Sequence, residues 1–262
     1  MGRFKTISNV IIGFVILLAV WQTSIMIGKY DEALFPPPLK VCEGILSLIE
    51  DGTIFTHFRV SLFRFLVGYL LAAVIAIVLG LVLGRLTRVW NVLDPIVQVL
   101  RPVSPIAWSP FIVLWFGIGD VPAIVIIFIA AFFPILLSTV SAVKKVDKTY
   151  LKIAQNFEMK PADLMKKIIF PASFPYIANG LHIAVGTAWI FLVAGEMVGA
   201  QSGLGYLIVD ARNSIRLDLV LAGIIFIGIS GLLLDKAVGL FERWIQRQWG
   251  GNGRNLKKKT ES

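Results

Sequence analysis

The sequence has little of what an enzyme needs. It contains one cysteine, Cys42, and two histidines, His57 and His182, so no intrachain disulfide can form and no cysteine and histidine cluster has the spacing of a metal site. The motifs G-x-S-x-G, H-E-x-x-H and G-x-x-x-x-G-K-[ST] are absent, which removes the residues of a hydrolase, a zinc protease and an intrinsic ATPase. We therefore predict that this chain is not an enzyme and binds no cofactor, and that any nucleotide energy enters through another subunit.

Charged residues are also scarce, at 16%, whereas hydrophobic residues make up 57% of the 262 residues and the mean hydropathy is +0.81. A soluble domain of this length cannot bury so many apolar side chains, but six membrane helices of roughly 20 residues each would take up about 120 positions. We therefore predict an all-α, polytopic membrane protein with about six transmembrane helices. The apolar runs place these helices near residues 7–28, 60–84, 96–117, 121–143, 176–198 and 218–240.

Basic residues outnumber acidic residues by 25 to 16. They lie between the apolar runs rather than on one water-facing surface, so we exclude nucleic acid as a partner and interpret the excess as a signal for orientation in the lipid bilayer. If the N-terminus is inside, 18 of the 25 lysines and arginines fall on inner segments and six fall on outer segments. The positive-inside rule then predicts that both termini are cytoplasmic, including a basic tail over residues 246–262.

Two segments carry a pattern beyond overall hydrophobicity. After the prolines at 36–38, apolar residues recur at helical spacing from Leu39 to Ile49, which predicts an amphipathic helix that either lies flat at the outer interface or caps the helix bundle. In the second span, small residues recur every four positions from Gly68 to Gly84. Such a stripe lets another backbone approach closely, so we expect this span to pack against a protein neighbour.

Four polar residues at predicted membrane depth are candidates for a pathway or gate, because such groups are costly in hydrocarbon and usually face a bundle interior. They are Arg101, Ser104, His182 and Glu196. Arg101 precedes prolines that break the helix, and it either lines a passage for an anion or extends to the inner surface. Glu196 either lines a gate or pairs with Arg212 or Arg216. His182 is either a hydrogen-bonding group between helices or a substrate ligand.

These intramembrane groups leave an alternative function open. A secondary transporter or channel that works alone could be coupled through Glu196, His182 and Arg101. Such a protein is expected to contain an inverted repeat, and the sequence has none that we can find. The alternative therefore depends on the three ionisable side chains alone.

The longest polar stretch between spans is the inner segment over residues 144–174. Its pattern predicts two short helices, Thr149–Phe157 and Pro161–Phe170, with Pro171 ending the second. Apolar side chains such as Ile153 interrupt this basic segment, and a solvated connector would not need them. We therefore expect the segment to dock to a cytoplasmic partner.

The same segment contains a distinctive spacing. Lys152-Ile153-Ala154 is followed by three residues, Glu158, nine residues and Ile168-Ile169-Phe170-Pro171. This spacing resembles the motif E-A-A, three residues, G, nine residues and I-x-L-P in the inner-membrane permease subunit of bacterial ABC importers, in the nitrate, sulfonate, taurine and bicarbonate group. Two positions depart from the motif. Lys152 replaces the acidic residue, and Glu158 replaces a glycine, which can adopt the positive φ of a turn at a lower energetic cost than glutamate. Further segments that resemble the family are residues 34–38, 101–105, 115–119, 132–135, 194–197 and 203–208.

The resemblance implies a type I permease in a bacterial plasma membrane, with its core over residues 59–245 after an N-terminal helix and external segment over residues 1–58. It implies a second permease chain, expected to form a homodimer, and two cytoplasmic ATP-binding subunits that hold ATP and Mg. An external solute-binding protein would deliver a small solute, expected to be an anion such as nitrate, sulfonate, taurine or bicarbonate. The residues that the resemblance assigns to ATPase coupling are Lys152, Ile153, Ala154, Phe157, Glu158, Ile168 and Pro171.

Overall fold

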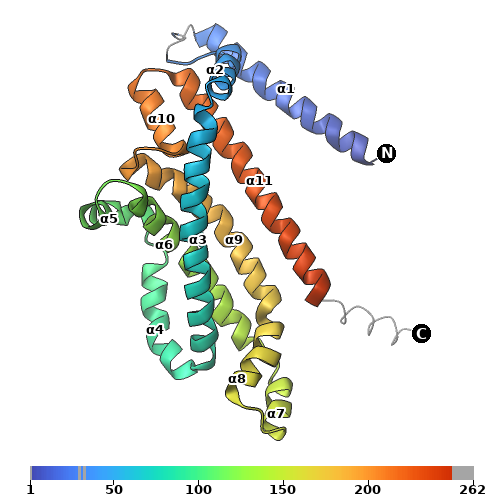
Figure 1. The fold of residues 1–262 in the computed structure, drawn as a ribbon. Coiled ribbons are helices and arrows are strands. Elements are labelled where there is room, and N and C mark those ends of the chain that lie inside the picture. Colours follow the sequence, from blue (N-terminus) through green and yellow to red (C-terminus); the bar gives the residue numbers. More distant parts are fainter. Residues whose placement is uncertain (1, 29–30, 32–33, 250–262) are drawn as a thin grey trace. The chain divides into compact units, whose positions relative to one another are not determined.

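A computed structural model describes residues 2–28, 31 and 34–249, so most of the predicted basic tail lies outside the described residues. Every regular element in these ranges is a helix, which confirms the predicted all-α class (Figure 1). The elements are α1 (Gly2–Gly28), α2 (Pro38–Glu50), α3 (Thr53–Arg85), α4 (Thr87–Leu100), η1 (Pro105–Trp108), α5 (Ser109–Phe116), α6 (Asp120–Lys144), α7 (Lys148–Asn156), α8 (Pro161–Leu164), η2 (Met165–Ile169), α9 (Phe170–Gly199), α10 (Leu204–Asn213) and α11 (Leu217–Trp249).

The long helices agree with five of the predicted spans. The segments that are long and apolar enough to cross a membrane are Ile11–Gly28, Thr53–Arg85, Asp120–Lys144, Pro161–Gly199 and Leu217–Arg243. The span expected near residues 96–117 is instead broken, since α4 and the helix over Pro105–Phe116 meet at 85°. Pro102 and Pro105 explain the break because neither has an N–H to donate to the helical ladder. This region is one bent span or a re-entrant segment.

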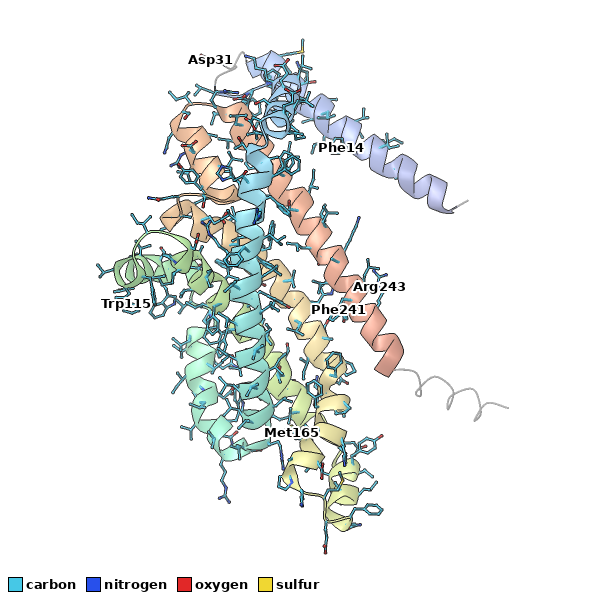
Figure 2. All side chains as sticks on the ribbon, in the orientation of Figure 1. Phe14, Asp31, Trp115, Met165, Phe241 and Arg243 are labelled. Carbon is cyan, nitrogen blue, oxygen red and sulfur yellow. The ribbon has the colours of Figure 1, made fainter. Side chains whose placement is uncertain are left out.

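Large apolar side chains project outward along these helices. Phe14 on α1 is 64% exposed and Phe241 on α11 is 61% exposed (Figure 2). A soluble protein rarely leaves such continuous apolar surface in water, whereas hydrocarbon covers it in a membrane. The outward face of each long helix therefore fits the membrane class predicted from composition.

The chain divides into two compact units, which are described separately. The first unit comprises residues 1–60 and 202–228, and the second comprises residues 61–201 and 229–262. The unit boundaries fall inside α3, between α9 and α10, and inside α11.

In the first unit, α2 forms the amphipathic helix that the sequence predicted. Its buried residues are Val41, Gly44 and Leu48, and a Cβ on Gly44 would lie only 3.2 Å from the side chain of Leu219 on α11. The predicted apolar stripe points the other way, and Leu39 on that stripe is 71% exposed. The helix therefore contacts α11 through the face opposite the predicted stripe, and the stripe itself is left exposed.

In the second unit, α6 and α9 pack along each other and α3 lies against α6. Close approach depends on glycine: a Cβ on Gly180 of α9 would overlap Ser138 of α6, and one on Gly80 of α3 would lie 2.6 Å from the Thr139 Cβ. The predicted small-residue stripe on α3 is buried throughout and consists of Gly68, Ala72, Ala76, Gly80 and Gly84. Its contacts confirm the expectation that this span packs against protein.

Candidate functional site

The inner loop between α6 and α9 begins with a capped helix. The Asp147 carboxylate accepts a hydrogen bond from the backbone N–H of Thr149 at 2.8 Å, in the first turn of α7. This bond favours the charged carboxylate and lowers the pKa of Asp147 below its usual value. The residue thus caps the first of the two short helices that the sequence predicted in this segment.

Glu158 makes the turn between α7 and α8. Its φ is +50°, and the N–H of Met159 donates to the Ala154 carbonyl at 3.0 Å. Helices commonly end at a residue with left-handed backbone angles, followed by an N–H that donates back to a carbonyl of the last turn. Glycine adopts these angles at the lowest energetic cost. The turn expected from a glycine is therefore made by glutamate, at a cost of about 1–2 kcal/mol.

Two faces of α7 differ in exposure. Ala154 is only 2% exposed, whereas Ile153 is 45% exposed and Phe157 is 77% exposed. Lys152 and Glu158 also lie on the surface, and Ile168 is half-buried. The loop therefore presents two large apolar side chains among charges, as a surface does when a partner covers it.

The prediction that Pro171 ends the second loop helix is wrong. After α8, the chain passes through one π-helical turn, η2, and continues as α9 to Gly199 without a break. Pro171 is tolerated because it stands in the first turn of α9, where the wider π turn changes the hydrogen-bond partners of the backbone. The loop is thus continuous with a membrane helix.

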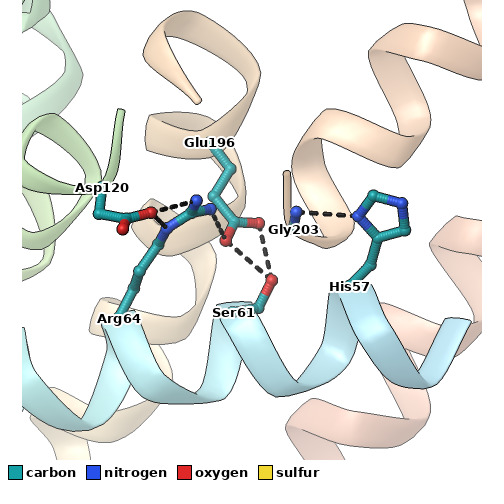
Figure 3. A network of polar contacts seen from close by, with 6 residues as sticks. All are labelled: His57, Ser61, Arg64, Asp120, Glu196 and Gly203. Carbon is teal, nitrogen blue, oxygen red and sulfur yellow. Dashed lines mark hydrogen bonds and ion pairs between the residues drawn. The ribbon is translucent and has the colours of Figure 1, made fainter. Parts of the chain in front are cut away.

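A buried ion cluster joins α3, α6 and α9 within the second unit (Figure 3). Arg64 on α3 donates from Nη1 to Glu196 Oε1 on α9 at 2.8 Å, and from Nε to Asp120 Oδ1 on α6 at 2.7 Å. The Ser61 hydroxyl lies 2.8 and 2.9 Å from the two Glu196 carboxylate oxygens. Arg64 and Glu196 are each 1% exposed, whereas the Asp120 side chain is 58% exposed.

This geometry corrects the expected partner of Glu196. Arg216 pairs with Asp218 instead, and Glu196 pairs with Arg64, one of the six basic residues that the positive-inside rule assigns to outer segments. A signal was nevertheless present, because Arg64 stands four residues before Gly68 and so continues the buried stripe of α3. A charge in register with a packing stripe indicates a buried ion pair.

The other histidine and arginine candidates lie elsewhere. His182 on α9 contacts Glu242 through Nδ1 at 2.8 Å and Asp235 through Nε2 at 3.0 Å, and both carboxylates belong to α11, so this histidine links two helices. Arg101 and Ser104 are exposed at the break between α4 and η1. Glu196, His182 and Arg101 therefore have different surroundings.

One polar contact in the first unit was not expected from the sequence. The N–H of Gly203, where φ is +103°, donates to Nδ1 of His57 at 2.9 Å (Figure 3). The His57 ring also lies near that of Tyr206, with 6.0 Å between the ring centroids. His57 thus holds the turn before α10.

Across residues 2–28, 31 and 34–249, no group of three histidine, cysteine or acidic side chains is arranged to hold a metal ion.

Comparison with known proteins places these features in context. Residues 72–247 match the family described as binding-protein-dependent transport system inner membrane component. The chain is 34% identical over 233 residues to the taurine transport system permease protein TauC of Escherichia coli (strain K12), covering 87% of this chain and 85% of TauC. It is 37% identical over 237 residues to the nitrate import permease protein NrtB of Leptolyngbya laminosa, covering 87% and 84%.

A solved structure shares the fold. The chain resembles one from the inward-facing MetNI methionine ABC transporter with a TM-score of 0.57 and 19% identity, over 72% of this chain and 97% of that chain. At this identity the likeness concerns the arrangement of helices alone.

Proposed function

Since the chain belongs to the family of binding-protein-dependent transport system inner membrane components, it is a multi-pass permease subunit of an ABC transporter. We propose that two copies of it form the membrane passage of an ATP-driven importer. Two cytoplasmic ATP-binding subunits, which hold ATP and Mg, dock on the inner loops. A solute-binding protein outside delivers the solute. Both termini are cytoplasmic, in agreement with the distribution of basic residues.

The observation that carries this proposal is the exposed apolar face of α7. Ile153 and Phe157 remain on the surface of a basic loop although Ala154, between them, is buried. Covering a large apolar side chain is worth about 1.5–3 kcal/mol. A cleft on the ATP-binding subunit that receives these two side chains would hold the loop firmly, with Lys152 and Glu158 setting the charge that the cleft has to match.

The continuity of the loop with α9 supports a mechanism for coupling. Because α8, η2 and α9 follow one another without a break, a displacement of the docked loop moves the inner end of α9. Glu196, at the other end of α9, is held to α3 through Arg64. ATP shifts the equilibrium between inward and outward states only if it binds one of them better. Closure of the ATP-binding subunits around ATP supplies that difference, and α9 transmits it.

We further propose that the solute is a small oxyanion, such as nitrate, a sulfonate, taurine or bicarbonate. Relatives that are similar over most of the chain are named for taurine and nitrate. Arg101 and Ser104 at the broken helix, with His182 and Glu196, are the candidates for residues along or beside the passage. The external binding protein would do much of the selection among these solutes.

The proposal is tested by producing the chain with the ATP-binding subunit and the solute-binding protein encoded beside it. In proteoliposomes, we expect uptake of the binding protein's ligand to require ATP and a catalytically competent ATPase. Phe157→Asp should abolish co-purification of the ATPase and uncouple ATP hydrolysis from uptake, whereas Phe157→Leu, which keeps the apolar surface, should retain both. Uptake driven by an ion gradient from this chain alone would instead support the stand-alone transporter.

A further inference from the structure

A cavity of about 360 Å³ lies behind the loop, on the side away from the exposed face of α7. We call it the loop cavity. The ends of α3 and α6, the start of α4 and the inward side chains of α7 and α8 enclose it. Residues that matter for its chemistry are Arg85, Thr87, Val143, Lys144, Leu151 and Leu164.

Both cations in the cavity stand at the ends of membrane helices. Arg85 is the last residue of the span Thr53–Arg85, and Lys144 is the last residue of the span Asp120–Lys144. Side chains at these positions lie where hydrocarbon gives way to the polar headgroups. The Lys144 ammonium is also held over the ring of Trp90, 5.4 Å from its centroid, which positions the charge without neutralising it.

The positive charge of the cavity is not balanced nearby. Within the described part of the chain, neither Arg85 nor Lys144 pairs with a carboxylate. Residues 85–88 and 144–167 together contain nine basic and three acidic side chains. Two of those acids are already engaged, because Asp147 accepts the Thr149 N–H and Asp163 pairs with Lys167. The residues that line the cavity therefore include two cations and no carboxylate.

Part of the cavity lining is apolar. Val143, Leu151 and Leu164 form this part, while Thr87 adds a hydroxyl in the first turn of α4, a helix whose N-cap residue Leu86 makes no side-chain cap. An inorganic anion would find partners only among the polar lining residues. A molecule with an anionic head and an apolar body matches both kinds of lining residue.

We propose that the loop cavity binds the headgroup phosphate of an anionic phospholipid from the cytoplasmic leaflet. Arg85 and Lys144 contact the phosphate, and the glycerol and upper acyl chain lie against Val143, Leu151 and Leu164. Because Leu151 and Leu164 belong to α7 and α8, the bound lipid braces the inner face of the loop whose outer face docks the ATPase. Lipid composition would thereby set how firmly the loop transmits the movement of the ATP-binding subunits.

Native mass spectrometry of the full chain in mild detergent tests this proposal. Phosphatidylglycerol should bind and phosphatidylcholine should not. Arg85→Gln with Lys144→Gln should weaken phosphatidylglycerol binding roughly thirtyfold, as expected for two cations near a lipid phosphate. The matched control is Arg88→Gln with Lys160→Gln, which removes the same charge from two residues that are equally exposed but do not line the cavity, and it should change binding less than threefold.

Several outcomes would overturn the proposal. Equal losses in the two double variants would mean that general charge attracts the lipid, and competition by millimolar inorganic phosphate would mean a site for free anions.

A photoactivatable phosphatidylglycerol on the wild-type chain gives a readout that needs no variant. Its cross-links should fall within residues 143–151 or 164–169, and cross-links only elsewhere would refute the site. None of these results bears on ATP-driven uptake, so the proposed function is tested independently.

Discussion

Arg64 Nη1 lies 2.8 Å from Glu196 Oε1, and neither side chain is more than 1% exposed. The pair joins α3 to α9, and Asp120 adds α6 through the remaining nitrogens of the guanidinium. Arg64 and Glu196 therefore stabilise the fold only as a pair, because each buried charged group depends on its partner.

We expect Arg64→Met to destabilise the protein by about 3–5 kcal/mol, because Glu196 is left as a buried, unpaired charge. Adding Glu196→Met should recover most of this loss, since both charges are then gone. Thermal unfolding of the purified chain in detergent measures the double-mutant cycle. Arg59→Met is the control, as Arg59 is exposed on the same helix and should change stability little. Additive effects in the cycle would show that the pair is not coupled.

Glu158→Gly should stabilise the loop by about 0.5–1 kcal/mol, because glycine avoids the steric cost of a φ of +50° but loses more backbone entropy on folding. Hydrogen exchange of the α7 amides should become slower. Lys152→Gly, inside α7, is the contrasting variant and should speed the same exchange because glycine lowers helix propensity. Faster exchange in Glu158→Gly would contradict the left-handed turn.

Acid should loosen the start of α7. The hydrogen bond from Thr149 lowers the pKa of Asp147 in the folded chain, so the cap is fully present above the unfolded pKa of about 3.9. It is lost as the pH falls through the lower folded value. Amide exchange at Thr149 and Tyr150 should therefore be protected at pH 6 and lose protection at a pH well below the unfolded pKa of the Asp147 carboxyl.

The substitution Asp147→Ala should remove this protection at both pH values. Asp147→Asn should keep it at both, because asparagine caps a helix without titrating. A wild-type acid response that persists unchanged in Asp147→Asn would show that another group is responsible.

Gly80→Ala should destabilise the protein by about 1–3 kcal/mol, because its Cβ would lie 2.6 Å from the Thr139 Cβ and force α3 away from α6. Gly186→Ala is the matched control, since a Cβ at Gly186 meets nothing within 4 Å and alanine favours the helix. The comparison is made by thermal unfolding of both variants. Equal stability would argue that α3 does not pack on α6 through this stripe.

Several features of the candidate site could be predicted from local sequence alone. The spacing of Lys152 and Glu158 indicated the loop motif, and exposed apolar residues such as Phe157 follow from placing two short helices in a basic segment. Pro171 misled the prediction because a proline at the start of a helix and one at its end look alike without knowledge of the neighbouring turn. A π turn has no sequence signature strong enough to decide between the two.

The partner of Glu196 could not be predicted, because it depends on which residues of distant helices meet. Arg64 and Glu196 are 132 positions apart, and sequence spacing says nothing about such a distance unless the packing of the helices is known. The same limit applies to the loop cavity, whose walls come from five helices and the π turn η2.

Composition by itself determined that this chain is an all-helical membrane protein, because apolar runs of this length can satisfy their backbone groups in lipid only as helices. Local spacing determined the loop motif and the small-residue stripe, since both are properties of one helix or one turn. The tertiary structure alone decided the ion cluster, the exposed stripe of α2 and the cavity behind the loop. Each of these depends on the close approach of separate helices, which packing sets and a linear pattern does not record.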